Sequence, residues 1–202
     1  MIRSKMAAAA VLAATGLAAH ASLVSVDWLA SGDGLLTQDS LTGLQWLDWS
    51  VTRGLTIAQA TTTFSGFRSA NSTEFNGLLA SAGLVNFNGY VPSELAAAQA
   101  FVDLLDTAGT ACSKSSTGSW ACGYYDYGDG TARIVNVGWT DIAGFGAYAT
   151  DQFGVQPLSS PGSSYGVLLV RNLPVSLPEP ATLALTAVAL AGIGASRRRR
   201  SG

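Results

Sequence analysis

The spacing of apolar residues predicts strands at both ends of the central part of the chain. Short apolar runs around a Gly32-Asp33-Gly34 turn indicate strands near the start, at 24–30, 35–39 and 44–49. Segments rich in Val, Tyr and Ile, separated by Gly and Asp, indicate an antiparallel sheet in the second half. Its strands are predicted at 123–127, 132–139, 146–150 and 165–171.

The segment between these two groups of strands has helical spacing instead. Thr56 is a predicted N-cap for a helix over 57–64, and Asn71-Ser72-Thr73-Glu74 has the spacing of a capping box that opens a second helix. A third helix is predicted over 93–107, where apolar residues recur at helical intervals. Those residues are Leu95, Ala98, Phe101, Val102 and Leu105.

Together these elements predict one α+β domain over residues 22–173, with an antiparallel sheet and two or three helices. A stretch of about 150 residues has the size of one ordinary domain and is long enough to bury a sizeable core. The large apolar side chains for that core include five tryptophans: Trp28, Trp46, Trp49, Trp120 and Trp139.

An apolar segment before this domain has the organisation of a signal peptide. A basic start leads into an Ala-rich region over 6–19, which has the length of a signal peptide rather than of a membrane-spanning helix. Ala19 and Ala21 form an A-x-A cleavage signal, so residues 1–21 are predicted to be removed and Ser22 to become the first mature residue. An uncleaved N-terminal helix is the alternative.

A second apolar segment follows the domain, inside a tail over 177–202. It occupies 181–196 and is long enough to enter a bilayer. The basic residues that close it are Arg197, Arg198, Arg199 and Arg200. Because these charges cross a membrane only at high cost, we expect them on the cytoplasmic side. The sequence therefore predicts a single transmembrane helix over 181–196, with a helix buried in the protein as the alternative.

Composition excludes several kinds of chemistry. The one histidine, His20, lies in the predicted signal peptide, so catalysis by imidazole and His-ligated zinc are excluded from the mature chain. The two cysteines are Cys112 and Cys122, and in an exported chain such a pair predicts a disulfide, with a free reactive thiol as the alternative.

The charge balance becomes acidic once the Lys and Arg of the two ends are set aside. Five basic residues then face thirteen acidic ones between Asp27 and Glu179, for a net charge near −8. A basic patch is excluded, and nucleic-acid binding with it. An acidic body of this kind suits divalent cations or basic partners.

One acidic turn is a candidate ligand site. Asp126 and Asp129 flank a Gly-bearing turn, with Tyr124 and Tyr125 just before it. Carboxylates in such a loop are ligands for calcium, and an aromatic neighbour stacks on a sugar ring. A hairpin turn is the alternative, because Asp-Gly is ordinary turn chemistry. Calcium at this turn is the one cofactor considered. No catalytic residue is predicted, because no carboxylate pair is marked out and no hydroxyl nucleophile has a base.

The tail resembles the PEP-CTERM sorting tail of exported bacterial proteins. Pro178, Glu179 and Pro180 stand directly before the apolar run and the arginines close it, so every part of that tail is present in order. The resemblance implies the general export machinery, signal peptidase and a membrane exosortase as partners, with the exosortase cutting near Pro178 to Pro180. It also implies a Gram-negative inner-membrane precursor, delivered to the cell surface, the outer membrane or the medium and associated with exopolysaccharide and biofilm.

Part of the domain is similar to a group of PEP-CTERM proteins with a D-x-x-T-G-L-x-W-L-D opening, related to the C-terminal domain of collagen-like bacterial surface proteins. The opening is matched at 39–48, a middle piece at 66–68 with Glu74, and the closing strand at 165–171. Phe67 stands where the group has Trp. The resemblance implies an α+β domain with a distant C-type-lectin-like look, and no known activity.

The opening motif also predicts how this segment packs. The residues expected to face the core are Leu44, Trp46 and Trp49. Gln45 and Asp48 are expected to point away from it. Arg68 and Glu74 are expected to form an ion pair that orients a helix.

Two classes of function remain. The first is a non-enzymatic surface or matrix protein that the tail sorts. The second is a calcium- or carbohydrate-binding module on the same delivery system, and a glycan-active hydrolase is a third candidate.

Overall fold

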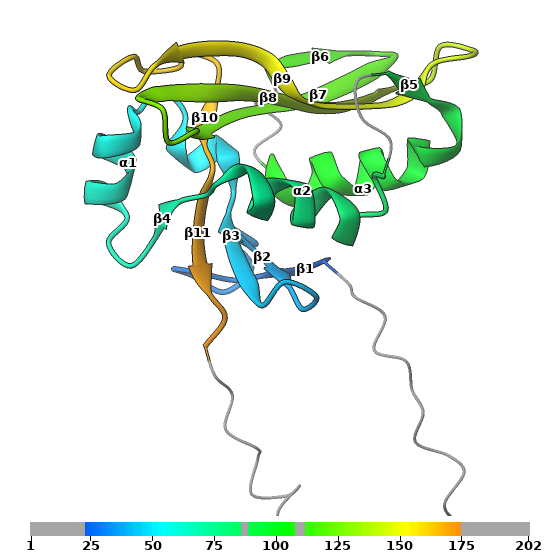
Figure 1. The fold of residues 1–202 in the computed structure, drawn as a ribbon. Helices are drawn as coiled ribbons and strands as arrows, with labels where there is room; N and C mark the ends of the chain where they lie inside the picture. The colour runs from blue at the N-terminus through cyan, green and yellow to red at the C-terminus, as the bar shows by residue number, and fades with distance from the viewer. Residues whose placement is uncertain (1–22, 86–88, 108–111, 175–202) are drawn as a thin grey trace, which may run out of the picture. The chain divides into compact units, whose positions relative to one another are not determined.

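The computed structural model describes residues 23–85, 89–107 and 112–174, and this part of the chain has three α-helices and two sheets (Figure 1). The predicted α+β class is therefore confirmed. The chain divides into two compact units, 1–172 and 173–202, and the elements described below belong to the first. No helix of the described residues is long and apolar enough to cross a membrane.

Several predictions made at the two ends lie outside the described residues. They concern the signal peptide 1–21 with Ala19, Ala21 and Ser22, the motif Pro178, Glu179 and Pro180, the apolar run 181–196, and the cluster Arg197, Arg198, Arg199 and Arg200.

The first sheet has five strands, all paired antiparallel. Their order in space is β1 (Leu23–Val26), β2 (Leu36–Asp39), β3 (Leu44–Leu47), β11 (Leu169–Asn172) and β4 (Arg68–Ser69). The first strand ends earlier than predicted because the Asp33 carboxylate accepts hydrogen bonds from the amides of Trp28, Leu29 and Ala30, which folds 28–33 into a turn. The hydrogen bond from the Trp28 amide is the main cause that lowers the pKa of Asp33 to about 2, and the other amides add to it.

The second sheet is longer and mostly antiparallel. Its order is β10 (Gly166–Val167), β7 (Gly118–Asp126), β8 (Thr131–Thr140), β9 (Gly146–Pro157) and β5 (Tyr90–Val91), and β6 (Ser113–Ser115) also pairs with β7. The β10–β7 pair is parallel. The prediction of a purely antiparallel sheet is wrong at this one edge, because β10 belongs to a chain segment that crosses between the two sheets.

That crossing segment was predicted as one strand over 165–171. Two strands occupy it instead, β10 in the second sheet and β11 in the first, with Leu168 between them. The Leu168 amide donates to the carbonyl of Tyr124 at 2.9 Å, and its carbonyl accepts from the amide of Ala70 at 2.8 Å. The backbone therefore stays extended and hydrogen-bonded while it passes from one sheet to the other.

The predicted helices are present with small differences at their ends. They are α1 (Ile57–Thr63), α2 (Ser72–Ser81) and α3 (Leu95–Leu105), with short 3₁₀ helices η1 (Trp49–Thr52) and η2 (Pro92–Glu94). Capping boxes open α1 at Thr56 and α2 at Asn71, as their sequences indicate. Along α3, which packs against β7, β8 and β9 of one sheet and β1 and β2 of the other, the predicted apolar positions Ala98, Phe101, Val102 and Leu105 are buried.

Two hydrophobic clusters occupy opposite faces of the strands. Trp46 and Trp49 lie in the larger one with α2 and α3, while Leu47 lies in the other, with Ala60 of α1. Because β3 sits between β2 and β11 and both of its faces are covered, the residues between the apolar ones are buried as well. The prediction that Gln45 and Asp48 point away from the core is therefore wrong, since they are 3% and 1% exposed.

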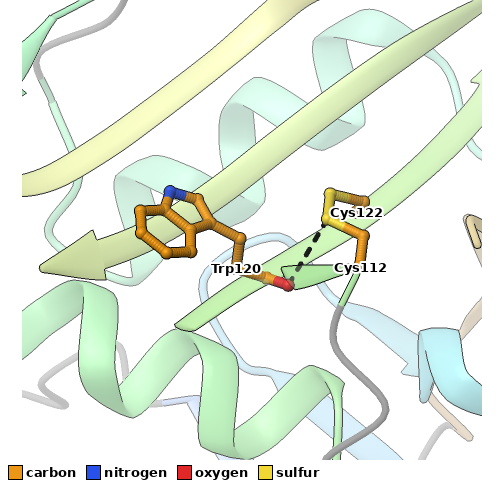
Figure 2. The surroundings of a disulfide bond; sticks show 3 residues. All are labelled: Cys112, Trp120 and Cys122. Carbon is orange, nitrogen blue, oxygen red and sulfur yellow. Dashed lines mark hydrogen bonds between the residues drawn. A yellow bond between two sulfur atoms is a disulfide. The ribbon is translucent and has the colours of Figure 1, made fainter. Parts of the chain in front are cut away.

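The predicted disulfide joins Cys112 to Cys122, with their Cα atoms 5.5 Å apart (Figure 2). The intervening segment is a hairpin of β6 and β7 rather than an irregular loop. The Cys112 Sγ atom lies 3.6 Å from the Trp120 carbonyl oxygen, which is a contact and not a hydrogen bond because an oxidised sulfur carries no proton. A crosslink over so short a loop contributes about 2–3 kcal/mol to stability.

Candidate functional site

The segments that carry the family resemblance meet in the structure and hold the fold together. The Arg171 Nε donates to Gln45 Oε1 at 2.8 Å, which joins the closing strand to the opening motif. The guanidinium of the same Arg171 lies over the Phe67 ring, 4.7 Å from its centroid. These contacts link three stretches far apart in sequence, so the motif residues act here as structural positions.

Asp48, the last residue of the opening motif, is a buried hydrogen-bond acceptor. One carboxylate oxygen accepts from the amide and hydroxyl of Ser50, at 2.8 and 2.6 Å. The other accepts from the amide and hydroxyl of Thr107, at 2.8 and 2.6 Å. The carboxylate thus caps η1 and ties it to the segment after α3.

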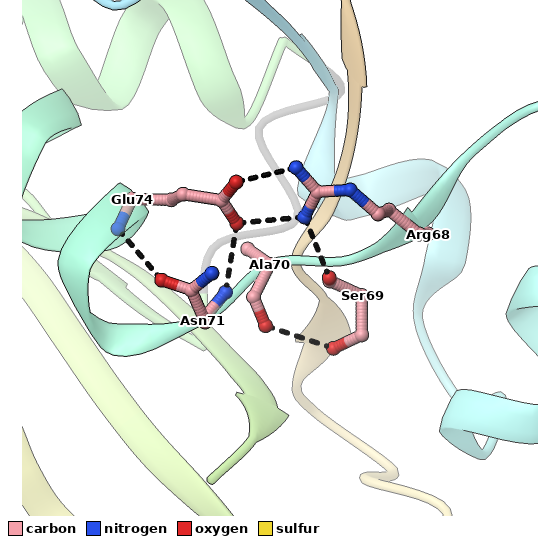
Figure 3. A network of polar contacts seen from close by, with 5 residues as sticks. All are labelled: Arg68, Ser69, Ala70, Asn71 and Glu74. Carbon is pink, nitrogen blue, oxygen red and sulfur yellow. Dashed lines mark hydrogen bonds and ion pairs between the residues drawn. The ribbon is translucent and has the colours of Figure 1, made fainter. Parts of the chain in front are cut away.

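Arg68 and Glu74 form the predicted ion pair at the start of α2 (Figure 3). The pair is bidentate, and the Glu74 side chain is 15% exposed while that of Arg68 is 52% exposed. Glu74 also accepts from the amide of Asn71 at 3.0 Å, which completes the capping box. The pair therefore fixes the short strand β4 against the first turn of α2.

A pH-dependent loss of stability should follow from this pair. The hydrogen bond from Arg68 is the main cause that lowers the pKa of Glu74 from its usual 4.5. The ionised carboxylate therefore stabilises the fold above pH 4.5, and that contribution is lost as the pH falls through the lowered pKa. We expect Glu74→Gln to cost about 0.5–1 kcal/mol at pH 7, because it removes the charge but keeps a capping side chain.

The check is urea unfolding of the wild type and of Glu74→Gln across the pH range. The difference between their free energies of unfolding should shrink below pH 4.5 and vanish in strong acid. A difference that stays constant down to pH 3, about 1.5 units lower, would contradict this assignment.

The acidic turn proposed for calcium is a β-hairpin turn between β7 and β8. Asp126 Oδ1 accepts from the Gly128 amide at 2.8 Å, and Asp129 Oδ1 accepts from the amide of Thr131 at 2.9 Å and from its hydroxyl. Within 23–85, 89–107 and 112–174, no three His, Cys, Asp or Glu side chains come together as metal ligands would. The carboxylates thus have local partners that explain their presence.

The tyrosines expected beside this turn cannot stack on a sugar. Tyr124 and Tyr125 are both fully buried, each in a different hydrophobic cluster. The Tyr124 hydroxyl donates to the carbonyl of Leu55. Burial raises the pKa of Tyr125 to about 12. The interpretation of these two residues as ligand-stacking groups is wrong, because the twofold alternation along β7 puts one side chain into each core.

A different set of aromatic residues forms an exposed surface that the sequence did not predict. We call it the aromatic row: Trp120 of β7, Tyr148 of β9, Tyr90 of β5, and Phe145 in the β8–β9 loop. The strand register aligns Trp120 with Gly138, Gly138 with Tyr148, and Tyr148 with Tyr90. The row therefore crosses four neighbouring strands in a line.

Three rings of the row contact one another, and two of them are exposed. Tyr90 lies 5.2 Å from Tyr148 and 4.7 Å from Phe145, measured between ring centroids. Tyr90 is 46% and Phe145 42% exposed. The Trp120 indole lies across Gly138 on the neighbouring strand, where a Cβ atom would fall 2.1 Å from the ring. Gly138 thus allows the indole to lie flat against the sheet.

The row lies on the face of the sheet that points away from α3. Val137 and Ala149, which flank Gly138 and Tyr148 along their strands, pack in the cluster that contains Phe101 of α3. Because side chains alternate between the two faces of a strand, Gly138 and Tyr148 point to the opposite side. Figure 1 shows α2 and α3 together on one side of this sheet.

A polar side chain with an unmet hydrogen bond lies beside the row. Asn136 is two residues before Gly138 on β8, on the same face, and pairs with Cys122 and Thr150 on the strands to either side. It is 8% exposed, and its Oδ1 atom has no hydrogen-bond donor. Buried acceptors are normally satisfied by a protein group or by an ordered water molecule.

Comparison with known proteins adds no assignment, because no protein-family model, curated protein or solved structure matches the chain. The function is therefore argued from the residues and their geometry.

Proposed function

We propose that this chain is an exported, non-enzymatic surface or matrix protein of a Gram-negative bacterium, sorted through its C-terminal tail. The structural observation that carries the proposal is the Cys112–Cys122 disulfide, because such bonds persist in oxidising compartments outside the cytoplasm. The acidic balance of the chain between its two ends also suits an extracellular environment. In the motif segments, the polar side chains described above are engaged in structural contacts rather than grouped for catalysis.

The route follows from the two ends of the sequence. Signal peptidase removes residues 1–21 during export, and the apolar run 181–196 stops transfer with Arg197–Arg200 in the cytoplasm. Pro178 and Pro180 keep the motif extended where the chain leaves the inner membrane on its outward-facing side, since proline disfavours helix in the residue before it. An exosortase then cuts near this motif and delivers the body to the surface or the matrix.

The intact mass of the protein from its own host tests this route. Protein from the membrane and from the medium is purified separately and weighed by mass spectrometry. We expect the surface or medium form to lack both ends, with any surplus mass identifying an attached group. A mass that still ends at Gly202, found only in the inner membrane, would contradict the proposal. A Glu179→Ala variant, with Asp141→Ala at an exposed carboxylate as the control, tests whether the motif directs the cut.

Two finer features of the proposal concern the body. The family resemblance supports an α+β domain with a distant C-type-lectin-like look. A carbohydrate-binding role is the second candidate function, and the observation that favours it is the exposed aromatic row. Calcium binding at Asp126 and Asp129 has no comparable support, because both carboxylates are engaged in the hairpin turn.

A further inference from the structure

We propose that the aromatic row binds a neutral polysaccharide chain, which lies across β7, β8, β9 and β5 with its sugar rings stacked on Trp120, Tyr148 and Tyr90. The inference deepens the proposed function and rests on it for the source of the ligand, since a matrix protein meets polysaccharide where it is delivered. The site itself is argued from the geometry of the described residues.

The shape of the row suits an elongated ligand. Trp120 and Tyr148 stand on strands separated by one other strand, so their backbones are about 10 Å apart, twice the spacing of neighbouring strands. Tyr90 extends the line by another strand, and Phe145 packs edge-on against Tyr90. A row of rings that extends in one direction suits a linear sugar chain better than a rounded small molecule.

The rings are also held in place before a ligand arrives. Tyr90 is in contact with rings on two sides, and the Trp120 indole rests on the backbone of Gly138. Side chains that are already ordered lose little conformational freedom on binding. Two of these rings, those of Tyr90 and Phe145, are more than two-fifths exposed. Large apolar side chains gathered on a surface usually mark an interaction site.

The chemistry of the surface selects the kind of ligand. The electron-rich face of an aromatic ring attracts polarised C–H groups, which a pyranose presents on its flat side while its hydroxyls point outward. None of the side chains in the row carries a charge, and none does in the adjacent cross-strand set of Cys122, Asn136 and Thr150. An uncharged surface of this kind favours a neutral glycan over an anionic one.

Asn136 provides a second and independent indication of a ligand. Its Oδ1 atom is buried next to the row and lacks a donor. An unpaired buried acceptor is unfavourable. A sugar hydroxyl above the neighbouring rings would donate the missing hydrogen bond, directly or through a water molecule. In ligand sites, a few polar groups beside an apolar surface fix the orientation of the ligand.

The test is sedimentation of the full-length chain, purified in detergent, with three insoluble neutral glycans: cellulose, chitin and curdlan. We expect the wild type to sediment with at least one of them. Tyr90→Ala and Phe145→Ala should each weaken that binding about tenfold, as truncation of a central aromatic contact does. The matched control is Tyr127→Ala, because Tyr127 is 45% exposed, close to the 46% of Tyr90, but lies at the other end of the β7–β8 hairpin. It should bind like the wild type.

Several outcomes would overturn the proposal. One is that the wild type binds none of the three glycans. Another is that Tyr90→Ala and Tyr127→Ala lose glycan binding equally. A third is a dimer in sizing experiments that Tyr90→Ala converts to a monomer while glycan binding stays unchanged. The last result would make the row a contact between two copies. Because Tyr90 and Phe145 are exposed, circular dichroism should show that both variants fold. If the chain is sorted as proposed but binds no glycan, only the glycan-binding proposal is overturned. If it binds glycan but keeps its C-terminal tail, only the sorting route is overturned.

Discussion

Replacing Asp48 by alanine should lower the free energy of unfolding by about 3–5 kcal/mol. The side chain is 1% exposed and accepts four hydrogen bonds, two from Ser50 and two from Thr107. A hydrogen bond to a charged group is worth about 1.5–3 kcal/mol, so the loss of four such bonds accounts for a cost of this size. Urea denaturation measures the change, and thermal unfolding should shift by about 10 °C or more.

Two further variants separate the acceptor role from the loss of a carboxylate as such. Asp126→Ala removes a carboxylate of the β7–β8 turn that accepts one amide, from Gly128, and should cost no more than about 1 kcal/mol. Ser50→Ala should be costly in the wild type but nearly neutral on the Asp48→Ala background, since the partner is already gone. Full additivity of these two changes, or an Asp48→Ala loss no larger than that of Asp126→Ala, would refute the assigned role.

The second large effect is expected from Gly166→Ala, which should destabilise the fold by about 3 kcal/mol or more. A Cβ atom at Gly166 would lie 2.0 Å from the carbonyl oxygen of Trp49 and 2.7 Å from its carbonyl carbon. Both are backbone atoms of η1, so the clash is relieved only by moving η1 away from β10. Overpacking of this kind costs about 1–3 kcal/mol when side chains can adjust, and more when they cannot.

Gly89→Ala is the matched control for this substitution. No atom lies within 4 Å of the Cβ position at Gly89, and its φ angle lies outside the region that favours glycine. We expect a change within about 0.5 kcal/mol for this variant, measured by the same urea titration. A Gly166→Ala protein as stable as Gly89→Ala would show that η1 and β10 are not in the close contact described.

The elements that the sequence predicted well are those with local signals. The N-cap at Thr56 and the capping box at Asn71 are predicted from neighbouring residues, and both helices begin where those residues indicate. The short strands β4 and β5 were missed, because two residues carry no periodicity and pair only with distant strands. The 165–171 segment was read as one strand, since nothing local marks Leu168 as the point where the chain changes sheets.

The candidate site depended on information that the sequence does not carry. Tyr90, Trp120 and Tyr148 belong to separate strands and come together only through register, which apolar spacing leaves open. The sequence instead drew attention to Tyr124 and Tyr125, which stand beside an acidic turn but alternate into the two cores. For Asp48, alternation predicts an outward side chain, but the residue follows β3 as the N-cap of η1, where its carboxylate is buried against Ser50 and Thr107.

On the proposed export route, the place of β11 has a consequence for the timing of folding. This strand completes the first sheet between β3 and β4, and it pairs Val170 with Trp46, two residues separated by most of the body. A chain that crosses a membrane from its N-terminus emerges with this strand last. The first sheet therefore remains in two pieces until residue 172 has crossed, and the closing contacts form only when the Pro178–Pro180 motif is about to follow. On that route, completion of the fold and arrival of the proposed sorting motif are nearly simultaneous events, and unfinished chains would expose the gap between β3 and β4 to proteases.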